Sequence, residues 1–138
     1  MKTIEVVLPG LLTTVQDLGR EGFGSLGISP SGAADAISLR LGNILVGNPQ
    51  NTAALEMTLL GGEFRFSEDC VTAVTGSDFG ATLEGAPISL WTAVQVRSGQ
   101  TLRLGQTRSG ARCYLCVQGG ILVKPFLAFL NIRGGSSL

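Results

Sequence analysis

Short segments of alternating apolar and polar residues, separated by glycines, fill most of this chain and constrain its fold more than any other feature. Phe64 and Phe66, for example, alternate with Glu63 and Arg65. This period of two is typical of a strand with one buried face, and the twenty glycines suit the turns and bulges between strands. The segments that fit are 4–8, 13–18, 53–59, 62–67, 71–76, 79–85, 91–99, 100–105 and 111–118.

The segment from residue 33 to residue 46 is the exception, because its apolar residues recur every three or four positions. That spacing places them on one face of a helix, with Asp35, Arg40 and Asn43 off that line. We therefore predict an amphipathic helix over about 33–46 that buries its apolar line against the strands. The residues of that line are Ala34, Ile37, Leu41, Ile44 and Leu45.

Both ends of this segment carry residues typical of helix termini. Ser31 or Ser29 can cap the N-terminus, and Gly47 followed by Asn48 and Pro49 supplies a stop. Many short strands with one principal helix predict a mainly β fold. We expect an antiparallel β-barrel, closed or half-open, with the helix plugging one end.

The length of 138 residues and their charge balance limit the expected number of domains and the classes of partner. A chain of this length suits one domain, which buries roughly two-thirds of its unfolded surface. Ten basic side chains balance ten acidic ones, so we expect neither nucleic acid nor a membrane as a partner. Glu5 and Pro9 interrupt the first apolar run, which is unlike a secretory leader and predicts a cytoplasmic protein.

The sequence contains no histidine, which removes the usual general base near neutral pH and the commonest metal ligand. Cys113 and Cys116 form a Cys-x-x-Cys, but the segment around them is typical of a strand, where residues three apart point to opposite faces. We therefore expect buried cysteines, no bound metal and no disulfide framework. Chemistry would rely on carboxylates, hydroxyls, arginine and backbone groups.

A literal Gly-x-Gly-x-x-Gly at Gly22, Gly24 and Gly27 raises the question of dinucleotide binding. Such a fingerprint needs a buried parallel strand before it and a helix that opens at the third glycine. Here the predicted helix opens later, after Ser31, and the flanking segments are typical of antiparallel strands. We therefore interpret the match as incidental.

A longer pattern of polar and glycine positions is more specific. It consists of Thr-x-x-Gln-Asp-x-Gly-Arg over 13–20, Ser-Gly-Ala-x-Asp over 31–35, Gly-Asn-Pro over 47–49, Leu-Glu over 55–56, and Ser-Gly-Ala-Arg-x-Tyr-Leu over 109–115 with a later Gly-Gly. Over residues 5–121 this pattern resembles the family known as the 5-oxoprolinase C subunit, KipA, biotin-dependent carboxyltransferase or allophanate hydrolase subunit 2.

The resemblance implies a cyclophilin-like barrel and, in the longer members of the family, two such lobes. It predicts one lobe over residues 1–121 and a diverged or truncated apolar tail over 122–138, where Lys124 and Pro125 interrupt the apolar run. An apolar run needs something to cover it. Either it packs back on the barrel, or a partner or a further part of the protein buries it.

The strongest local cluster of polar residues joins Gln16, Asp17 and Arg20, at the end of one strand, to Ser31 and Asp35 at the start of the helix. The N–H groups of a helix start attract an anion such as a carboxylate or a carboxybiotin oxygen, and Arg20 could add a bidentate contact. In the structural alternative, Ser31 caps the helix, Asp35 complements its dipole, and Asp17 with Arg20 fixes the turn. These four residues and Glu56 are our catalytic candidates, and we assign no cofactor-binding residue.

Glu56 lies in an apolar strand, where a lone buried carboxylate is costly unless it is paired. We expect an ion pair with Arg112 or Arg40, with a functional acid as the alternative. Asp78 lies beside glycines and is interpreted as a turn residue. Trp91 could stack on a flat ligand, but a tryptophan at the start of a strand is expected in the core.

The resemblance implies an enzyme subunit that is inactive alone: part of an ATP-dependent 5-oxoprolinase that opens 5-oxoproline to glutamate with a KipI-like and a LamB/YcsF-like subunit. A second possibility is the carboxyltransferase part of a urea carboxylase-like system, moving a carboxyl group from biotin to a small amide substrate. A third is a regulatory module that binds a KipI-like inhibitor of a kinase, and a fourth is a bare lobe without activity.

No cofactor is expected on this chain alone. ATP would be used by the complex, or biotin would be carried on another chain. Lys124, between a valine and a proline, does not resemble the lysine of a biotin carrier domain.

Overall fold

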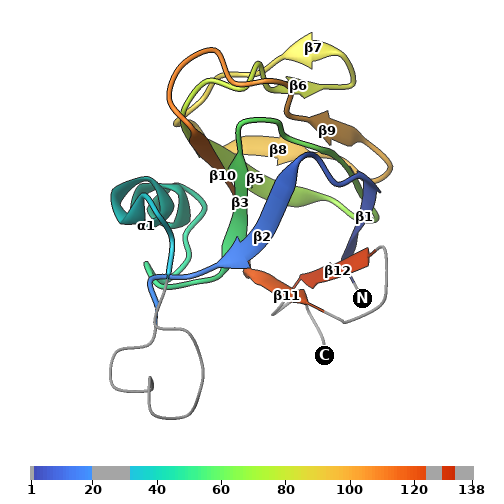
Figure 1. Cartoon of the computed structure of the whole chain (residues 1–138). Helices are drawn as coiled ribbons and strands as arrows, with labels where there is room; N and C mark the ends of the chain where they lie inside the picture. The colour runs from blue at the N-terminus through green and yellow to red at the C-terminus, as the bar shows by residue number, and fades with distance from the viewer. Residues whose placement is uncertain (1, 20–31, 124–128, 133–138) are drawn as a thin grey trace.

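The computed structural model describes residues 2–19, 32–123 and 129–132, and it contains β-strands and one helix (Figure 1). The elements are β1 (Thr3–Leu8), β2 (Leu12–Gln16), α1 (Ala36–Leu45), β3 (Ala54–Thr58), β4 (Glu63–Phe66), β5 (Cys70–Gly76), β6 (Thr82–Leu83), β7 (Ala86–Pro87), β8 (Val94–Val96), β9 (Thr101–Arg103), β10 (Arg112–Val117), β11 (Ile121–Val123) and β12 (Phe129–Ile132).

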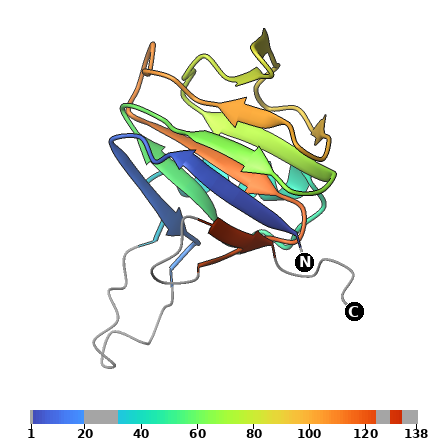
Figure 2. The same ribbon diagram turned by 90° about the vertical axis from the view of Figure 1, so that its right-hand side faces the viewer.

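The strands form two antiparallel sheets. One has the order β11-β12-β1-β4-β9-β6-β7, and the other, which we call the helix-side sheet, has the order β2-β3-β10-β5-β8. Figure 2 shows the long strands of the two sheets stacked as layers. The mainly β, antiparallel fold predicted from the sequence is confirmed. Among the described residues no named strand of one sheet pairs with a strand of the other, so the predicted barrel is observed as two layers.

The main core lies between the two sheets and follows the alternation seen in the sequence. Phe64 and Phe66 on β4 are completely buried. Glu63 and Arg65 point outward from the same strand, where Arg65 pairs with Glu5 of β1. Burying an aromatic side chain of this size contributes roughly 1.5–3 kcal/mol, so the alternating strands account for much of the stability.

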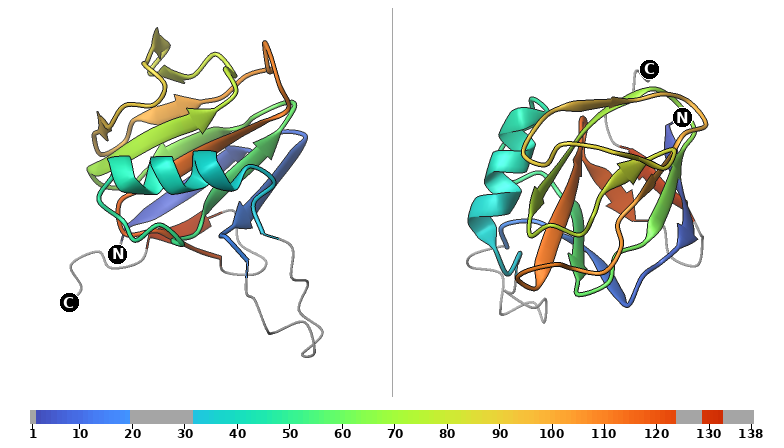
Figure 3. Two further views of the ribbon diagram at one scale, coloured as in Figure 1. Left: turned by 90° about the vertical axis from the view of Figure 1, so that its left-hand side faces the viewer. Right: turned by 90° about the horizontal axis from the view of Figure 1, so that it is seen from above.

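A second, smaller core lies between the helix-side sheet and α1 (Figure 3). Strand β10 serves both cores: Cys113 and Leu115 face the other sheet, while Tyr114 and Cys116 face the helix. The prediction that Cys113 and Cys116 point to opposite faces is confirmed, and both thiols are free and buried.

The helix begins later than the sequence predicted, and its cap is a different residue. It spans Ala36–Leu45, and Asp35 is its N-cap, with a side chain that accepts a hydrogen bond from the backbone N–H of Ser38. The predicted caps, Ser31 and Ser29, lie outside the described residues, and the capping role assigned to them was wrong. The predicted stop is confirmed: Gly47 has a φ of +79° and donates to the carbonyl of Ile44.

The predicted inner face of the helix was also wrong. Ser38, Leu39, Gly42 and Asn43 are buried, whereas the four large aliphatic residues of the predicted apolar line are exposed. The inward polar groups have partners. The carbonyl of Ser38 accepts a hydrogen bond from Thr75 Oγ1, and the Asn43 amide donates to two backbone carbonyls. Polar groups that form hydrogen bonds can be buried at little cost in free energy. The spacing of apolar residues alone therefore did not predict that these polar residues face the sheet.

Strand pairing extends into the segment expected as a tail. β12 pairs with β1, and β11 pairs with β12, in registers such as Ile4 opposite Leu130 and Ile121 opposite Ile132. These parts of the tail therefore pack back on the sheet. Lys124 and Pro125 lie outside the described residues, and the division into a lobe and a diverged tail stays a prediction.

Two further expectations differ from the structure. The segment 79–85 contributes only the two-residue strand β6, and β7, β11 and β12 were not predicted. Trp91, expected in the core, is 41% exposed and has a φ of +58°. The helix of the described residues is too short to cross a bilayer.

The contact between α1 and β10 is close enough to test by substitution. A Cβ added at Gly42 would lie 2.5 Å from Cys116 Sγ and 3.2 Å from Thr75 Oγ1. Glycine to alanine in a helix normally stabilises by about 1 kcal/mol. Here we expect Gly42→Ala to lower the free energy of unfolding by about 1–3 kcal/mol, because the packing must expand. Urea unfolding measures this change.

The matched test is the double variant Gly42→Ala with Cys116→Ala. Removal of the sulfur takes away the atom that the new methyl group meets, so the double variant should lose less stability than the sum of the two single variants. If the losses in the free energy of unfolding are additive, the side chains at positions 42 and 116 do not interact, and the close contact between α1 and β10 is contradicted.

Candidate functional site

The structure brings two of the five catalytic candidates together at the start of α1. Asp35 is the N-cap residue and Glu56 lies on β3, and both contact the Tyr114 hydroxyl. Asp17 follows β2 and accepts, through its carbonyl, a hydrogen bond from Ala33 N–H. The other two candidates, Arg20 and Ser31, lie outside the described residues.

Glu56 is held by two hydrogen bonds to the same carboxylate oxygen. Its Oε2 accepts from Tyr114 Oη at 2.6 Å and from the backbone N–H of Ala34 at 2.9 Å. The side chain is 11% exposed. These bonds satisfy a buried carboxylate and fasten the segment before the helix to the helix-side sheet.

The second oxygen of Glu56 faces Arg112. The distance from Glu56 Oε1 to Arg112 Nε is 3.9 Å, and Nε is buried without a hydrogen-bond partner. Arg112 and Tyr114 alternate on β10, and Tyr114 lies opposite Glu56 in the register, so all three side chains share one face of the sheet. Of the two partners predicted for Glu56, the structure shows Arg112, while Arg40 is exposed on the helix.

Tyr114 is the residue that the search for catalytic groups in the sequence missed. Its hydroxyl donates to Glu56 and accepts from the backbone N–H of Asp35 at 2.9 Å. Burial raises the pKa of Tyr114 above its ordinary value, and the hydrogen bond to Glu56 raises it further. The Arg-x-Tyr of the family pattern could have identified Tyr114, because residues two apart on a strand share a face and this pair places a hydroxyl beside a cation.

Asp35 and Asp17 both have structural partners in this cluster. The Asp35 carboxylate accepts from Ser38 N at 3.1 Å and from Ser38 Oγ at 2.5 Å, so it is engaged in the cap. Asp17 Oδ1 accepts from Gly19 N at 2.8 Å in a local turn. Both carboxylates are thus held by local structural contacts, although Asp35 serves as the cap itself, the role that the sequence had assigned to Ser31.

Gly32 allows the chain before α1 to lie directly against the backbone that follows β2. A Cβ added there would lie 2.6 Å from the backbone nitrogen of Gly19. The described residues on either side of segment 20–31 are therefore in direct contact, close to the start of α1. Gly19 and Gly32 thus both lie near the Glu56 cluster, while Arg20, Ser31 and the Gly22–Gly27 motif lie outside the described residues.

The thiols of the chain take no part in this cluster. Burial raises the pKa of Cys116 to about 12 and raises that of Cys113 as well. Both are therefore protonated near neutral pH and unsuited to act as nucleophiles or metal ligands. Within the described ranges, no three side chains among Cys, Asp and Glu gather closely enough to hold a metal ion.

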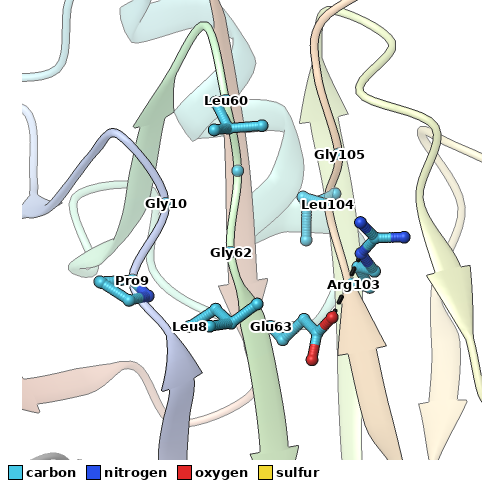
Figure 4. A pocket seen from close by; sticks show the side chains of 10 residues that line it. Leu8, Pro9, Gly10, Leu60, Gly62, Glu63, Arg103, Leu104 and Gly105 are labelled. Carbon is cyan, nitrogen blue, oxygen red and sulfur yellow. Dashed lines mark ion pairs between the residues drawn. The ribbon is translucent and has the colours of Figure 1, made fainter.

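A separate hollow of about 310 Å³ lies where the connection from β1 to β2 approaches β4 and β9 (Figure 4). Its walls include Leu8, Leu60 and Leu104, and Arg103 at its side pairs with Glu63 at 3.2 Å. None of the three candidates that the structure describes, Asp17, Asp35 and Glu56, lines it. Among its described lining residues the one cation is already engaged, so these residues offer mainly apolar contact.

Comparison with known proteins places this geometry in a family. Residues 26–128 match the carboxyltransferase domain, subdomain A and B. The chain belongs to the carboxyltransferase domain family. Its Gly-x-Gly-x-x-Gly lies outside the described residues, but β2 before it is antiparallel to its neighbour and α1 begins only at Ala36, an arrangement unlike a dinucleotide site.

Individual relatives agree with this assignment. The chain is 44% identical over 90% of its length to urea amidolyase of Saccharomyces cerevisiae, and 43% identical over 83% of its length to the 5-oxoprolinase C subunit of Haemophilus influenzae. The crystal structure of the K. lactis urea amidolyase matches 91% of the chain with a TM-score of 0.83 at 40% identity. The chain spans only 7%, 37% and 8% of these three proteins, respectively.

The two roles of the Glu56 side chain can be separated by substitution. Glu56→Gln keeps an oxygen that can accept from Tyr114 Oη and Ala34 N, and loses the charge that faces Arg112. Glu56→Ala leaves both donors unsatisfied, at about 1–3 kcal/mol for each. We therefore expect Glu56→Ala to destabilise clearly more than Glu56→Gln in urea unfolding. Equal stability of Glu56→Ala and wild type would show that this cluster does not hold the helix start.

Tyr114 gives the cluster a pH dependence that can be observed directly, because the sequence contains one tyrosine. Its pKa is 10.0 without perturbation and is raised in the folded chain. The folded state keeps the proton that the unfolded chain loses near pH 10, so this contribution to stability is present below pH 10 and is lost as pH rises through the folded pKa. We expect ultraviolet titration to show delayed ionisation.

Tyr114→Phe is the control for that pH dependence. Its free energy of unfolding should be lower than that of wild type at neutral pH and should fall less steeply above pH 10. An absorbance titration of the folded wild type centred on the ordinary tyrosine value would contradict the buried hydrogen bond.

Proposed function

We propose that this chain is a subunit, or the N-terminal lobe of a subunit, of a multi-subunit ATP-dependent 5-oxoprolinase. In this proposal it works with KipI-like and LamB/YcsF-like partners to hydrolyse 5-oxoproline to glutamate in the cytoplasm. The observation that carries the proposal is the 43% identity to the 5-oxoprolinase C subunit of Haemophilus influenzae, which extends over most of this chain.

The polar cluster at the start of α1 supports a role beside an amide carbonyl. Opening an amide ring develops charge on the carbonyl oxygen, which cations and backbone N–H groups stabilise. Arg112 is the cation of the cluster, and Glu56 is its carboxylate. We assign Glu56, Asp35 and Asp17 as positioning residues first, because their described contacts all hold the chain in place. Arg20 and Ser31 remain candidates for contact with substrate.

Dependence on partners fits what the chain itself offers. The sequence has no histidine, the thiols are buried, and the carboxylates of the described cluster are engaged by hydrogen bonds. No complete set of nucleophile, base and oxyanion donors is found among the described residues. The missing groups would come from the partner subunits.

A biotin-dependent carboxyltransferase is the second candidate, favoured by the 44% identity to urea amidolyase. In that reaction a carboxyl group moves from biotin, carried on another chain, to an amide substrate. Among the described residues, Arg103 beside the hollow is paired with Glu63, and Arg112 faces Glu56. We derive no step through biotin on this chain.

Reconstitution tests the proposal directly. The purified chain is combined with purified KipI-like and LamB/YcsF-like subunits, and 5-oxoproline-dependent hydrolysis of ATP is followed. We expect turnover only when all three components are present, and none from the chain alone. Urea with a biotin carrier that has been carboxylated beforehand, supplied in place of 5-oxoproline, is the matched control for the second candidate, because the carboxybiotin then provides the carboxyl group that is transferred.

Three results would contradict the proposal. Turnover that needs a longer, two-lobed relative and never appears with this chain would make it a bare lobe. Tight binding to the KipI-like subunit without turnover would make it a regulatory module. Carboxyl transfer in the control reaction would favour the second candidate.

A further inference from the structure

The pair formed by Arg112 and Glu56 is more buried than a comparable pair on the other sheet, and yet it is less closely joined. Arg65 Nε donates to Glu5 Oε1 at 3.0 Å, with side chains that are 50% and 34% exposed. Between Arg112 and Glu56 the same two atoms are 3.9 Å apart, with side chains that are 40% and 11% exposed. Such a distance is too long for a hydrogen bond. The pair therefore stays open where an unmade bond costs most.

Glu56 presents a fixed hydrogen-bond acceptor at this opening. The residue is 8% exposed, and the donors Tyr114 Oη and Ala34 N–H both bond to Oε2. In the ranges 2–19, 32–123 and 129–132, no group donates a hydrogen bond to Oε1. Because the bonds to Oε2 already hold the carboxylate, a ligand that bonds to Oε1 has little side-chain motion to arrest.

The guanidinium of Arg112 places donors beside that acceptor. Its Nε is buried and has no partner among the described residues. No described group accepts a hydrogen bond from its terminal nitrogens either, and the side chain is 40% exposed. Strand register puts Thr58 opposite Arg112 and Tyr114 opposite Glu56, so the pair lies on the face that also carries α1. The helix packs mainly on β5 and β10, which leaves the β3 side of this face more open.

Charge and hydrogen-bonding capacity together select the chemistry of a ligand here. Glu56 and Asp35 place two carboxylates near one guanidinium, which disfavours a further anion, and the exposed Arg112 disfavours a cation. A neutral ligand must accept from Arg112 and donate to Glu56. An amide held in the cis form does both along one edge, because its N–H and C=O lie side by side in a lactam ring or in urea. In an open-chain trans amide these two groups point in opposite directions.

We propose that Glu56 Oε1 and the Arg112 guanidinium recognise the cis-amide edge of a small molecule. Glu56 Oε1 accepts the amide N–H, Arg112 donates to the carbonyl oxygen, and Oε2 keeps its positioning role. This inference deepens the proposed function and rests on it for the choice between a lactam such as 5-oxoproline and urea. Arg112 then lies where negative charge develops when the amide carbonyl is attacked.

The test titrates the purified chain with 2-pyrrolidinone, a neutral lactam that presents the recognised edge alone. The backbone N–H of Ala34, bonded to Glu56 Oε2, is the reporter in nuclear magnetic resonance spectra. We expect its signal to shift and saturate. N-methyl-2-pyrrolidinone, which lacks the N–H, is the matched control ligand. It should bind at least about tenfold more weakly, because a hydrogen bond to a charged group is lost.

Glu56→Gln tests the role of Oε1 separately from folding. Its amide oxygen can still accept from Tyr114 and Ala34, which turns an NH₂ donor toward the ligand in place of Oε1. We expect 2-pyrrolidinone to bind about tenfold more weakly or worse, and its preference over the N-methyl compound to disappear. A purely structural role of Glu56 would leave that preference unchanged, and the inference would then be wrong.

Arg112→Gln should weaken both lactams alike, because both keep the carbonyl group. Arg65→Gln is the matched control variant: it removes the arginine of the closed pair on the other sheet and should bind 2-pyrrolidinone like wild type. Urea unfolding of each variant verifies that the chain remains folded.

Titrations with 5-oxoproline and with millimolar urea distinguish the two sources of the amide. If urea binds with the same dependence on Glu56 and the lactams do not, the amide site stands, and the second candidate function replaces the proposed one. If none of these amides binds, or if acetate binds more tightly than they do, the recognition of an amide by this pair is wrong. The proposed function is then still decided by the reconstitution.

Discussion

The buried carboxylate of Glu56 organises the half of this molecule that carries the helix. A carboxylate that is 11% exposed must be given partners when the chain folds. The partners come from three places: Ala34 before the helix, Tyr114 on β10 and, at longer range, Arg112. Because Tyr114 also accepts from the backbone of Asp35, the residue that caps α1 is fixed to the same point. The start of the helix is therefore set by polar contacts with the sheet.

This attachment explains why α1 shows its apolar side to the outside. Once the N-cap is fixed over β3 and β10, the rotation of the helix decides which residues meet the sheet. Gly42 then lies against Cys116, and the carbonyl of Ser38 meets Thr75 Oγ1. A larger side chain at position 42 would meet Cys116 Sγ and Thr75 Oγ1. The sheet side of α1 therefore holds Ser38, Gly42 and Asn43 together with one large aliphatic residue, Leu39, whereas the other large aliphatic residues of the helix are exposed.

Much of the fold could be predicted from the sequence because it depends on local alternation. The strand of Phe64 and Phe66 has one apolar face and one charged face, and a period of two is sufficient to identify it. The opposite directions of Cys113 and Cys116 follow from the same geometry. The pairing of Glu56 with a cation was also predictable, since an apolar strand leaves a carboxylate few alternatives.

The helix face and Tyr114 could not be predicted by the same means, because both depend on contacts between residues distant in sequence. Asn43 is suited to the interior only because two carbonyls near residues 50–52 face its amide. By its strand alternation alone, Tyr114 resembles an ordinary core aromatic, and its role becomes visible only when β3 brings Glu56 to its hydroxyl. In both cases the local pattern of apolar residues is insufficient, because the burial of Asn43 and of the Tyr114 hydroxyl depends on hydrogen-bond partners that are distant in sequence.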